Sequence, residues 1–206
     1  IYSGSSGSSP TSLTAVGNTL YFSANDGTNG NELWKSDGTS SGTVMVKDIN
    51  SGGSSDPSEL TAVGNTLYFR AYEGTNGNEL WKSDGTSSGT VMVKDIYSGG
   101  SSGSPSYLTA IGNTLYFRAY DGTNGIELWK SDGTSSGTVM IKDIFSGSSH
   151  SYPAHLTAVG ITLYFVASDG TNGIELWKSD GTASGTVMVK DINNGSGSSY
   201  SSNLAA

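Results

Sequence analysis

Two histidines and several regularly spaced carboxylates are the residues of this sequence best suited to chemistry. His150 and His155 lie five residues apart in one short segment, and two imidazoles can hold a metal ion weakly. No acidic residue lies between them to act with them as a base, so we interpret the pair as surface residues. Serine is abundant, but no serine sits in a nucleophile elbow or before a helix in a phosphate-binding glycine loop, because the sequence shows no helical period.

The aspartates that recur at turns are the best candidates for a metal site. Asp26, Asp121 and Asp169 align in one Asp-Gly turn, where the remaining copy has Glu73. These turns lack the alternating Asp and Asn ligands of a calcium loop. We therefore predict that the turn aspartates accept hydrogen bonds from backbone N–H groups and that the chain has no resident cofactor or metal. Calcium at these turns is the alternative.

A stretch of eight residues, Glu-Leu-Trp-Lys-Ser-Asp-Gly-Thr, organises the chain. It occupies residues 32–39 and returns unchanged at residues 79–86, 127–134 and 175–182. It belongs to four nearly identical copies, which we place at residues 13–49, 60–96, 108–144 and 156–192. Copies this short cannot bury a core alone and must stack, which predicts a single repeat domain over residues 1–206. The signature residues that we expect to be structural are Glu32, Trp34, Asp37, Glu79, Trp81, Asp84, Glu127, Trp129, Asp132, Glu175, Trp177 and Asp180.

Each copy is predicted to form four β-strands joined by tight turns. In the first copy the strands are expected at residues 13–16, 19–25, 31–36 and 43–49. The first connection is the dipeptide Gly17-Asn18, a two-residue hairpin turn whose residues tolerate positive φ. In the fourth copy the dipeptide is Gly160-Ile161. A β-branched residue fits such a turn poorly, so we expect that hairpin to differ.

One pairing scheme sorts the side chains of a copy onto two apolar faces. It places Leu13 against Phe22, Ala15 against Leu20, Phe22 against Trp34, Trp34 against Met45 and Glu32 against Lys47, all on one face. The opposite face collects Val16, Tyr21, Leu33, Val44 and Val46 with Lys35. A sheet with large apolar residues on both sides must be covered on both, as in a stack of sheets. We interpret the recurring Glu–Lys pair as a structural ion pair and the Trp–Met pair as core packing.

Composition excludes several classes of partner. The net charge of −8 argues against nucleic acid and anionic membrane surfaces, which reward clustered Lys and Arg. Cysteine is absent, so disulfides and thiolate metal sites are excluded. No run of 18 apolar residues occurs, and we expect no membrane insertion. The sequence begins without an initiating Met or a signal peptide, which suggests a processed secreted product or a segment of something longer.

The two ends of the chain duplicate the Gly/Ser-rich connector that separates the copies. Residues 1–12 and 193–206 both match it, so five connector-like segments serve four copies. Three explanations follow: the chain is part of a longer array, the ends overlap at closure, or one molecule's tail occupies the equivalent place in a neighbour. The last would give head-to-tail polymers, because a heterologous contact that does not close propagates.

Four-stranded antiparallel sheets of this length, covered on both faces, predict an all-β, β-propeller-like array of four blades. The motif Glu-Leu-Trp-x-Ser-Asp-Gly-Thr-x-x-Gly-Thr at residues 32–43, 79–90, 127–138 and 175–186 resembles the tandem repeats of bacterial secreted and surface proteins. The resemblance covers nearly the whole chain. It implies an extracellular or cell-surface location in repeat arrays, and no defined activity.

Strict repetition works against an enzyme, because a catalytic constellation is singular. We therefore predict a non-catalytic structural or adhesive module that self-assembles head to tail into fibres or belongs to a longer array. The alternative is a multivalent carbohydrate-binding lectin, since sugars are recognised by an aromatic face beside polar groups. Its candidate residues are Tyr72, Tyr120, Asn76 and Asn124. The outer copies have Asn25 and Ser168 in place of the tyrosines, which limits an aromatic site to the central two.

Overall fold

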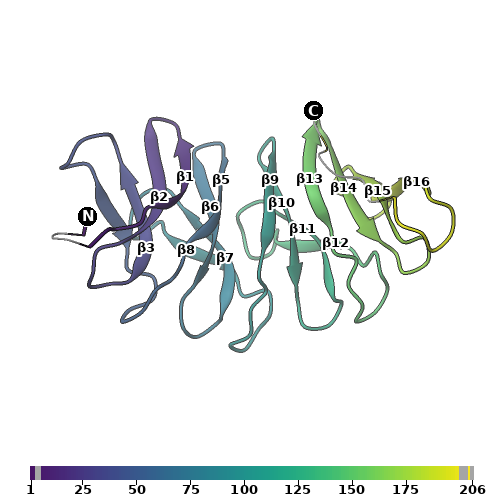
Figure 1. Ribbon diagram of the computed structural model, residues 1–206, viewed down its shortest axis with the longest axis horizontal. Coiled ribbons are helices and arrows are strands. Elements are labelled where there is room, and N and C mark those ends of the chain that lie inside the picture. The colour runs from purple at the N-terminus through teal and green to yellow at the C-terminus, as the bar shows by residue number, and fades with distance from the viewer. Residues whose placement is uncertain (3–5, 200–203, 205–206) are drawn as a thin grey trace. The chain divides into compact units, whose positions relative to one another are not determined.

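The computed structural model describes residues 1–2, 6–199 and 204, and within them the fold is all-β (Figure 1). Sixteen strands form four four-stranded antiparallel sheets, and in each sheet neighbouring strands follow one another along the chain. The predicted fold class, a propeller-like array of four blades, is confirmed. In the described part of the chain no helix is long and apolar enough to cross a membrane.

The chain divides into two compact halves of two blades each: the N-terminal half, Ile1–Ser104, and the C-terminal half, Pro105–Ala206. The strands of the N-terminal half are β1 (Thr11–Val16), β2 (Thr19–Asn25), β3 (Asn31–Ser36), β4 (Val44–Lys47), β5 (Ser58–Val63), β6 (Thr66–Tyr72), β7 (Asn78–Ser83) and β8 (Val91–Lys94). Those of the C-terminal half are β9 (Ser106–Ile111), β10 (Thr114–Tyr120), β11 (Ile126–Ser131), β12 (Val139–Lys142), β13 (Ala154–Val159), β14 (Thr162–Ser168), β15 (Ile174–Ser179) and β16 (Val187–Lys190).

The first strand of each blade carries a β-bulge that the sequence did not reveal. Thr14 pairs with Tyr21 and Thr11 with Ser23, so Ser12 and Leu13 together oppose Phe22. The predicted one-to-one Leu13–Phe22 pair is therefore replaced by a two-to-one arrangement. The bulge residue has positive φ in each blade, at Ser12, Glu59, Tyr107 and His155.

A second bulge, between the third and fourth strands, overturns one predicted pairing. Ala15–Leu20, Phe22–Trp34 and Trp34–Met45 pair as predicted. Beyond Met45 the register shifts by one residue, and Lys47 pairs with Leu33. The predicted Glu32–Lys47 pair is wrong, because the bulge at Val46 leaves Lys47 opposite Leu33, one residue short of Glu32. The same shift recurs in the other three blades, where Lys94, Lys142 and Lys190 pair with Leu80, Leu128 and Leu176.

The hairpin of the fourth blade does not differ from the others. Val159 pairs with Thr162 in the register that Val16 and Thr19 adopt. In this turn only Gly160 has positive φ, at 60°, and the residue after it does not. Ile161 is therefore tolerated, because the left-handed requirement falls entirely on the glycine.

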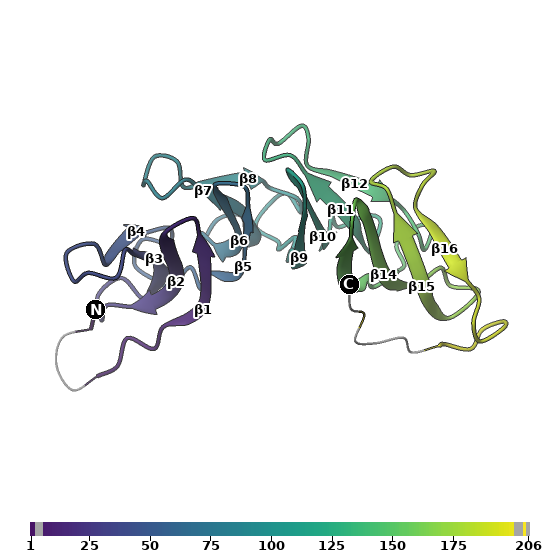
Figure 2. The same ribbon diagram turned by 90° about the horizontal axis from the view of Figure 1, so that it is seen from above.

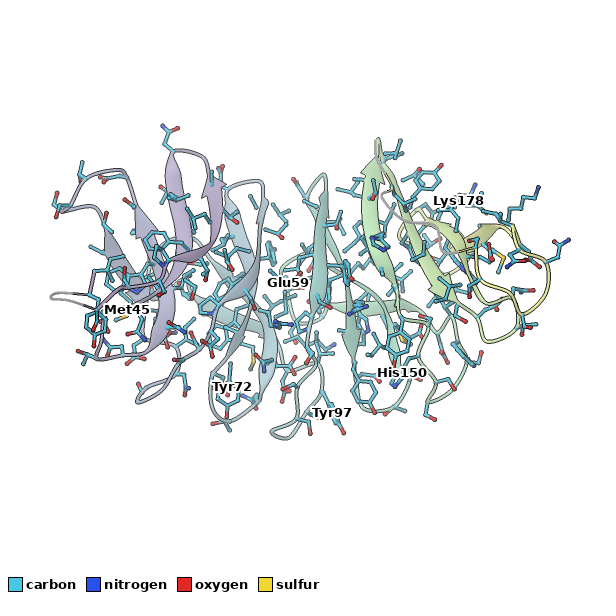
Figure 3. The ribbon with its side chains drawn as sticks, in the orientation of Figure 1. Met45, Glu59, Tyr72, Tyr97, His150 and Lys178 are labelled. Carbon is cyan, nitrogen blue, oxygen red and sulfur yellow. The ribbon has the colours of Figure 1, made fainter. Side chains whose placement is uncertain are left out.

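The core of each half lies where two blades meet face to face (Figure 2). In the N-terminal half the cluster joins Tyr21, Leu33 and Val46 of the first blade to Leu67, Phe69 and Trp81 of the second. In the C-terminal half the equivalent cluster joins Tyr116, Leu128 and Ile141 to Leu163, Phe165 and Trp177. Buried residues thus occur on both predicted faces of a blade. Phe22 and Trp34, on the other face of the first blade, are also buried, with Met45 packed against them (Figure 3).

Substitutions in the Gly160-Ile161 turn should separate the roles of its two residues. Gly160→Ala places a side chain at positive φ and is expected to lower the free energy of unfolding by about 1 kcal/mol. Ile161→Asn, which restores the residue of the other copies, is expected to change it by less than about 0.5 kcal/mol, because Ile161 is 87% exposed. Urea unfolding followed by tryptophan fluorescence measures both. A large gain from Ile161→Asn would contradict the observed turn geometry.

Candidate functional site

The signature aspartates cap the turn between the third and fourth strands. Asp37 Oδ1 accepts hydrogen bonds from the backbone N–H of Thr39, at 2.9 Å, and from its hydroxyl, at 2.7 Å. These bonds hold the pKa of Asp37 below its usual value, because they favour the ionised carboxylate. Asp84, Asp132 and Asp180 accept the same two bonds from Thr86, Thr134 and Thr182. Each carboxylate is thus engaged by its own turn.

The signature glutamates are buried beneath the connectors instead of pairing with lysine. Glu32, Glu79, Glu127 and Glu175 have no exposed surface. Glu127 Oε2 accepts hydrogen bonds from Ile144 N at 2.9 Å and from Ser151 Oγ at 2.6 Å, and Oε1 accepts one from Ser151 N at 3.0 Å. The carboxyl therefore fastens the end of the fourth strand and the connector to the middle of its own sheet.

Burial sets the ionisation of these glutamates. Loss of hydration raises the pKa of Glu79 and Glu127 to about 7 and also raises that of Glu32, while the hydrogen bonds from the connector act in the opposite direction. Ser151 Oγ also lies 3.3 Å from the carbonyl oxygen of Ile126. When Glu127 is protonated, this hydroxyl can donate to Ile126 and accept from the carboxylic acid, so both charge states are accommodated.

A connector serine joins two consecutive blades through its backbone. Ser55 N donates to Asn31 O and to Glu32 Oε1 of the preceding blade. Ser55 O accepts from Tyr72 N of the following blade. Ser151 repeats both contacts between the third and fourth blades, with Ile126 O and Ser168 N. Sequence reasoning missed this residue, although a serine that recurs at nearly the same spacing after the signature glutamate was a usable signal.

In each half the lysines of the first blade donate to backbone carbonyls of the second. Lys47 Nζ lies 2.9 Å from Thr90 O, and Lys35 Nζ lies 2.8 Å from Gly85 O. In the C-terminal half Lys142 reaches Thr186 O and Lys130 reaches Gly181 O, at 2.8 and 2.7 Å. Lys47 and Lys142 also lie over the rings of Trp81 and Trp177, 5.9 and 5.8 Å from the ring centres. These four lysines thus bind the neighbouring blade of their half, and among the residues that the structure describes no Glu–Lys ion pair within a blade is seen.

The four signature tryptophans belong to the core. Their exposed fractions are 9% for Trp34, 6% for Trp81, 5% for Trp129 and 5% for Trp177. Trp177 Nε1 donates to Ala167 O of the same blade at 3.0 Å. Rings this deeply covered stabilise the stack and offer no open face to a ligand.

The predicted sugar-binding residues lie in pairs at the loop between the second and third strands. Tyr72, at the end of β6, is 37% exposed, and its hydroxyl donates to Gly74 O at 3.3 Å (Figure 3). The side-chain amide of Asn76 donates to Glu73, and that of Asn124 donates to Asp121, both within the turn. Tyr120 lies edge-on to His150 with ring centres 5.7 Å apart. The asparagines therefore shape the loop, and the tyrosines remain as the aromatic surfaces beside it.

His150 replaces a serine that anchors the connector in the other blades. Its Nδ1 accepts a hydrogen bond from Ile126 N at 2.8 Å (Figure 3). The hydroxyls of Ser54, Ser102 and Ser198 accept the equivalent bonds. His155 occupies the bulge position and lies edge-on to Tyr107. In the described ranges no three His, Asp or Glu side chains are grouped so as to hold a metal ion. Calcium binding at the turns stays an alternative prediction.

Comparisons with known proteins place the fold and leave the activity open. No protein-family model and no curated protein matches the sequence. Two similar solved structures are of puromycin hydrolase. The S511A mutant complexed with PGG matches with a TM-score of 0.57 and 16% identity, and a second puromycin hydrolase structure matches with a TM-score of 0.56 and 16% identity. A prolyl endopeptidase structure matches with a TM-score of 0.53 and 14% identity.

These structural matches cover 89%, 88% and 84% of this chain but only 29%, 29% and 24% of the matched ones. The chain thus spans less than a third of the length of these hydrolases. At such low identity the likeness concerns the propeller-like fold, and the hydrolytic activities belong to the matched proteins. The resemblance to the tandem-repeat surface proteins stays a prediction.

A double-mutant cycle between Glu127 and Lys142 tests the corrected register. Glu127→Gln should cost about 1–3 kcal/mol of unfolding free energy, because an amide cannot accept all three hydrogen bonds. Lys142→Met should cost about 1 kcal/mol through its lost interblade bond. Their coupling, measured by urea unfolding, is expected to stay within about 0.5 kcal/mol, since they bind different partners. A coupling of about 2 kcal/mol would instead indicate the buried ion pair.

The raised glutamate pKa values predict that stability falls as pH rises. Below pH 4.5, the ordinary glutamate value, both folded and unfolded chains hold these protons. Between there and about pH 7 the folded chain binds more protons than the unfolded one, so the unfolding free energy declines. The loss should be roughly 1–3 kcal/mol per carboxyl.

Urea midpoints at pH 5, 6, 7 and 8 measure this decline, and Glu127→Gln should make the slope shallower. Below about pH 4 stability should fall again, because the turn aspartates Asp37 and Asp84, whose pKa values are lowered, then become protonated. Stability that climbs steadily from pH 5 to pH 8 is incompatible with this account.

Proposed function

We propose that this chain is a non-catalytic structural or adhesive repeat module that acts outside the cell, where it self-assembles head to tail into fibres or forms part of a longer array. This proposal is supported by the hydrogen bonds that the repeated polar side chains make. The aspartates cap turns, the glutamates hold connectors, and the lysines of the first blade in each half bind the second blade. Groups engaged in this way contribute to folding and stacking, which is the use expected of a structural module.

The observation that best supports this proposal is the pair of lysine contacts that crosses from one blade to the next within each half. Lys35 and Lys47 of the N-terminal half lie 2.8 and 2.9 Å from their carbonyl oxygens. Lys130 and Lys142 of the C-terminal half repeat these contacts at 2.7 and 2.8 Å. A junction that repeats so closely favours a function in which blades are added to blades. The extracellular location is proposed from the resemblance of the repeats.

A glycan-binding module is the second candidate, supported by an aromatic group in the C-terminal half. His150 lies between Tyr120 and Tyr152, with ring centres 5.7 and 5.1 Å away, and Tyr152 is 52% exposed. Exposed aromatic faces of this kind stack against sugar rings. The first blade has Asn25 and Asp56 at the positions of the two tyrosines, so a sugar site here would not be repeated in every blade.

Electron microscopy and a glycan array separate the two candidates. Regular fibres of purified protein, together with no saturable glycan binding, are expected from the structural module. Saturable binding that Tyr120→Ala reduces by about tenfold, and that Tyr72→Ala leaves unchanged, would establish the glycan-binding module instead. Isolated particles at every concentration would remove the self-assembling part of the proposal.

A further inference from the structure

One face of the fourth blade corresponds to the face of the first blade that carries Tyr21 and Leu33. In the fourth blade this face has no partner blade covering it. We call it the trailing face and define it by Val159, Tyr164, Leu176, Val189 and Ile192. Val189 and Ile192 are 45% and 53% exposed. Their counterparts in the first blade, Val46 and Ile49, are 6% and 9% exposed, because the second blade covers them. An apolar pocket of about 260 Å³ lies on the trailing face.

The face of the first blade that carries Phe22 and Trp34 is open at Leu13 and Leu20, whereas Phe22 and Trp34 are themselves buried. We call it the leading face and define it by Leu13, Leu20, Phe22 and Trp34. Leu20 is 36% exposed, whereas its counterparts Leu67 and Leu163 are fully buried in the clusters of the two halves. Leu13 is 60% exposed, while Leu60 and Leu156 pack against those clusters.

The polar contacts of a blade junction are also unused at both ends. Lys178 and Lys190 correspond to Lys130 and Lys142, which donate to Gly181 O and Thr186 O, and both are exposed. Lys178 is labelled in Figure 3. The ammonium group of neither lysine makes a hydrogen bond within the described part of the chain. On the leading side, Gly38 is exposed, whereas Gly85 and Gly181, which accept from lysine, are buried.

We propose that the trailing face binds the leading face of a second copy of this chain, in the register of the junctions within each half. Lys178 then donates to Gly38 O and Lys190 to Thr43 O, as Lys35 and Lys47 donate to Gly85 O and Thr90 O. The apolar residues that meet in this interface are the counterparts of those that meet in the cores of the two halves. This inference rests on the proposed head-to-tail function and specifies its interface. Each added copy presents a new open face, so the contact propagates.

The terminal segments occupy the places that a neighbouring copy would fill. Thr157 Oγ1 lies 3.4 Å from Leu204 O, in the same contact that Thr14 and Thr109 make with Leu60 and Leu156 of the next blade. Leu204 therefore stands in for the first-strand leucine of a following blade. In the assembled state Leu13 of the second copy takes this place, and Leu204 leaves it.

The two terminal segments each make part of the hydrogen bonds that a complete connector makes. Ser199 N donates to Ile174 O and Glu175, the contacts of a connector with the blade before it. Ser8 O accepts from Asn25 N, the contact of a connector with the blade after it. Ser199 and Ser8 of two copies thus correspond to one residue, such as Ser55, at a complete junction.

Sedimentation velocity of the full chain over a range of concentrations tests the interface. Wild-type mass should grow with concentration. Val189→Glu and Leu20→Asp should each weaken association by about a hundredfold or more, because an unpaired charge enters an apolar interface. Val187→Glu and Val44→Asp are the matched controls. Val187 is 37% exposed, and its counterparts Val44 and Val139 are still 39% and 37% exposed although another blade follows each of them in the same half, so this position stays accessible to solvent when a junction forms.

Mixing the two interface variants distinguishes a head-to-tail contact from a symmetric one. Val189→Glu keeps its leading face and Leu20→Asp keeps its trailing face, so an equal mixture should form dimers and stop there. Dimers in either variant alone would indicate that one face pairs with itself and would overturn the proposal. Deletion of residues 200–206 should strengthen wild-type association, since the stand-in Leu204 is removed. Loss of association on this deletion would make the tail the binding element and also overturn it.

Two further outcomes separate this interface from the function on which it rests. If wild type assembles and Val189→Glu assembles equally well, this interface is wrong while the self-assembling module stands. If wild type remains a single chain and Val189→Glu lowers its melting temperature more than Val187→Glu does, the trailing face is covered within one chain, and both the interface and fibre formation fail.

Discussion

A sheet that is apolar on both faces cannot stand alone in water, and every other feature of this chain follows from that constraint. Tyr21 and Leu33 on one face and Phe22 and Trp34 on the other give a single blade two surfaces to hide. One neighbour hides one of them. An open row of blades therefore has two faces left at its ends, whatever the number of blades. The hydrophobic effect that drives stacking is also the force by which, as we propose, the end faces of two copies bind each other.

Polar groups give the apolar contact its register. Large apolar faces slide at little cost, whereas hydrogen bonds demand particular positions. Within each half, the lysine-to-carbonyl contacts and the serine backbone contacts of the connector fix two separate points of the junction between its blades. The buried glutamate ties the connector to the sheet behind it, so the connector cannot shift without exposing a carboxyl in an apolar layer.

Much of the fold was predictable because repetition averages out local ambiguity. Alternation of side chains and the turn dipeptides located the strands, and the pairs Phe22–Trp34 and Trp34–Met45 formed as expected. The bulges were not predictable, because a bulge changes the count of residues without changing the apolar pattern around it. One such bulge turned an apparent Glu32–Lys47 pair into two unrelated contacts. The exposure of Leu20 and Val189 was likewise hidden, since their sequence contexts are those of buried residues.

The lysines that span the junction within each half bind main-chain oxygens, at Gly85, Thr90, Gly181 and Thr186. A carbonyl acceptor is supplied by whatever amino acid occupies the position, so the recognition does not depend on a matched side chain across the seam. Any blade can therefore follow any other without compensating changes. A gene that loses or gains one whole copy through slippage would still encode seams of unchanged chemistry, and the number of copies could drift while the joint stays the same.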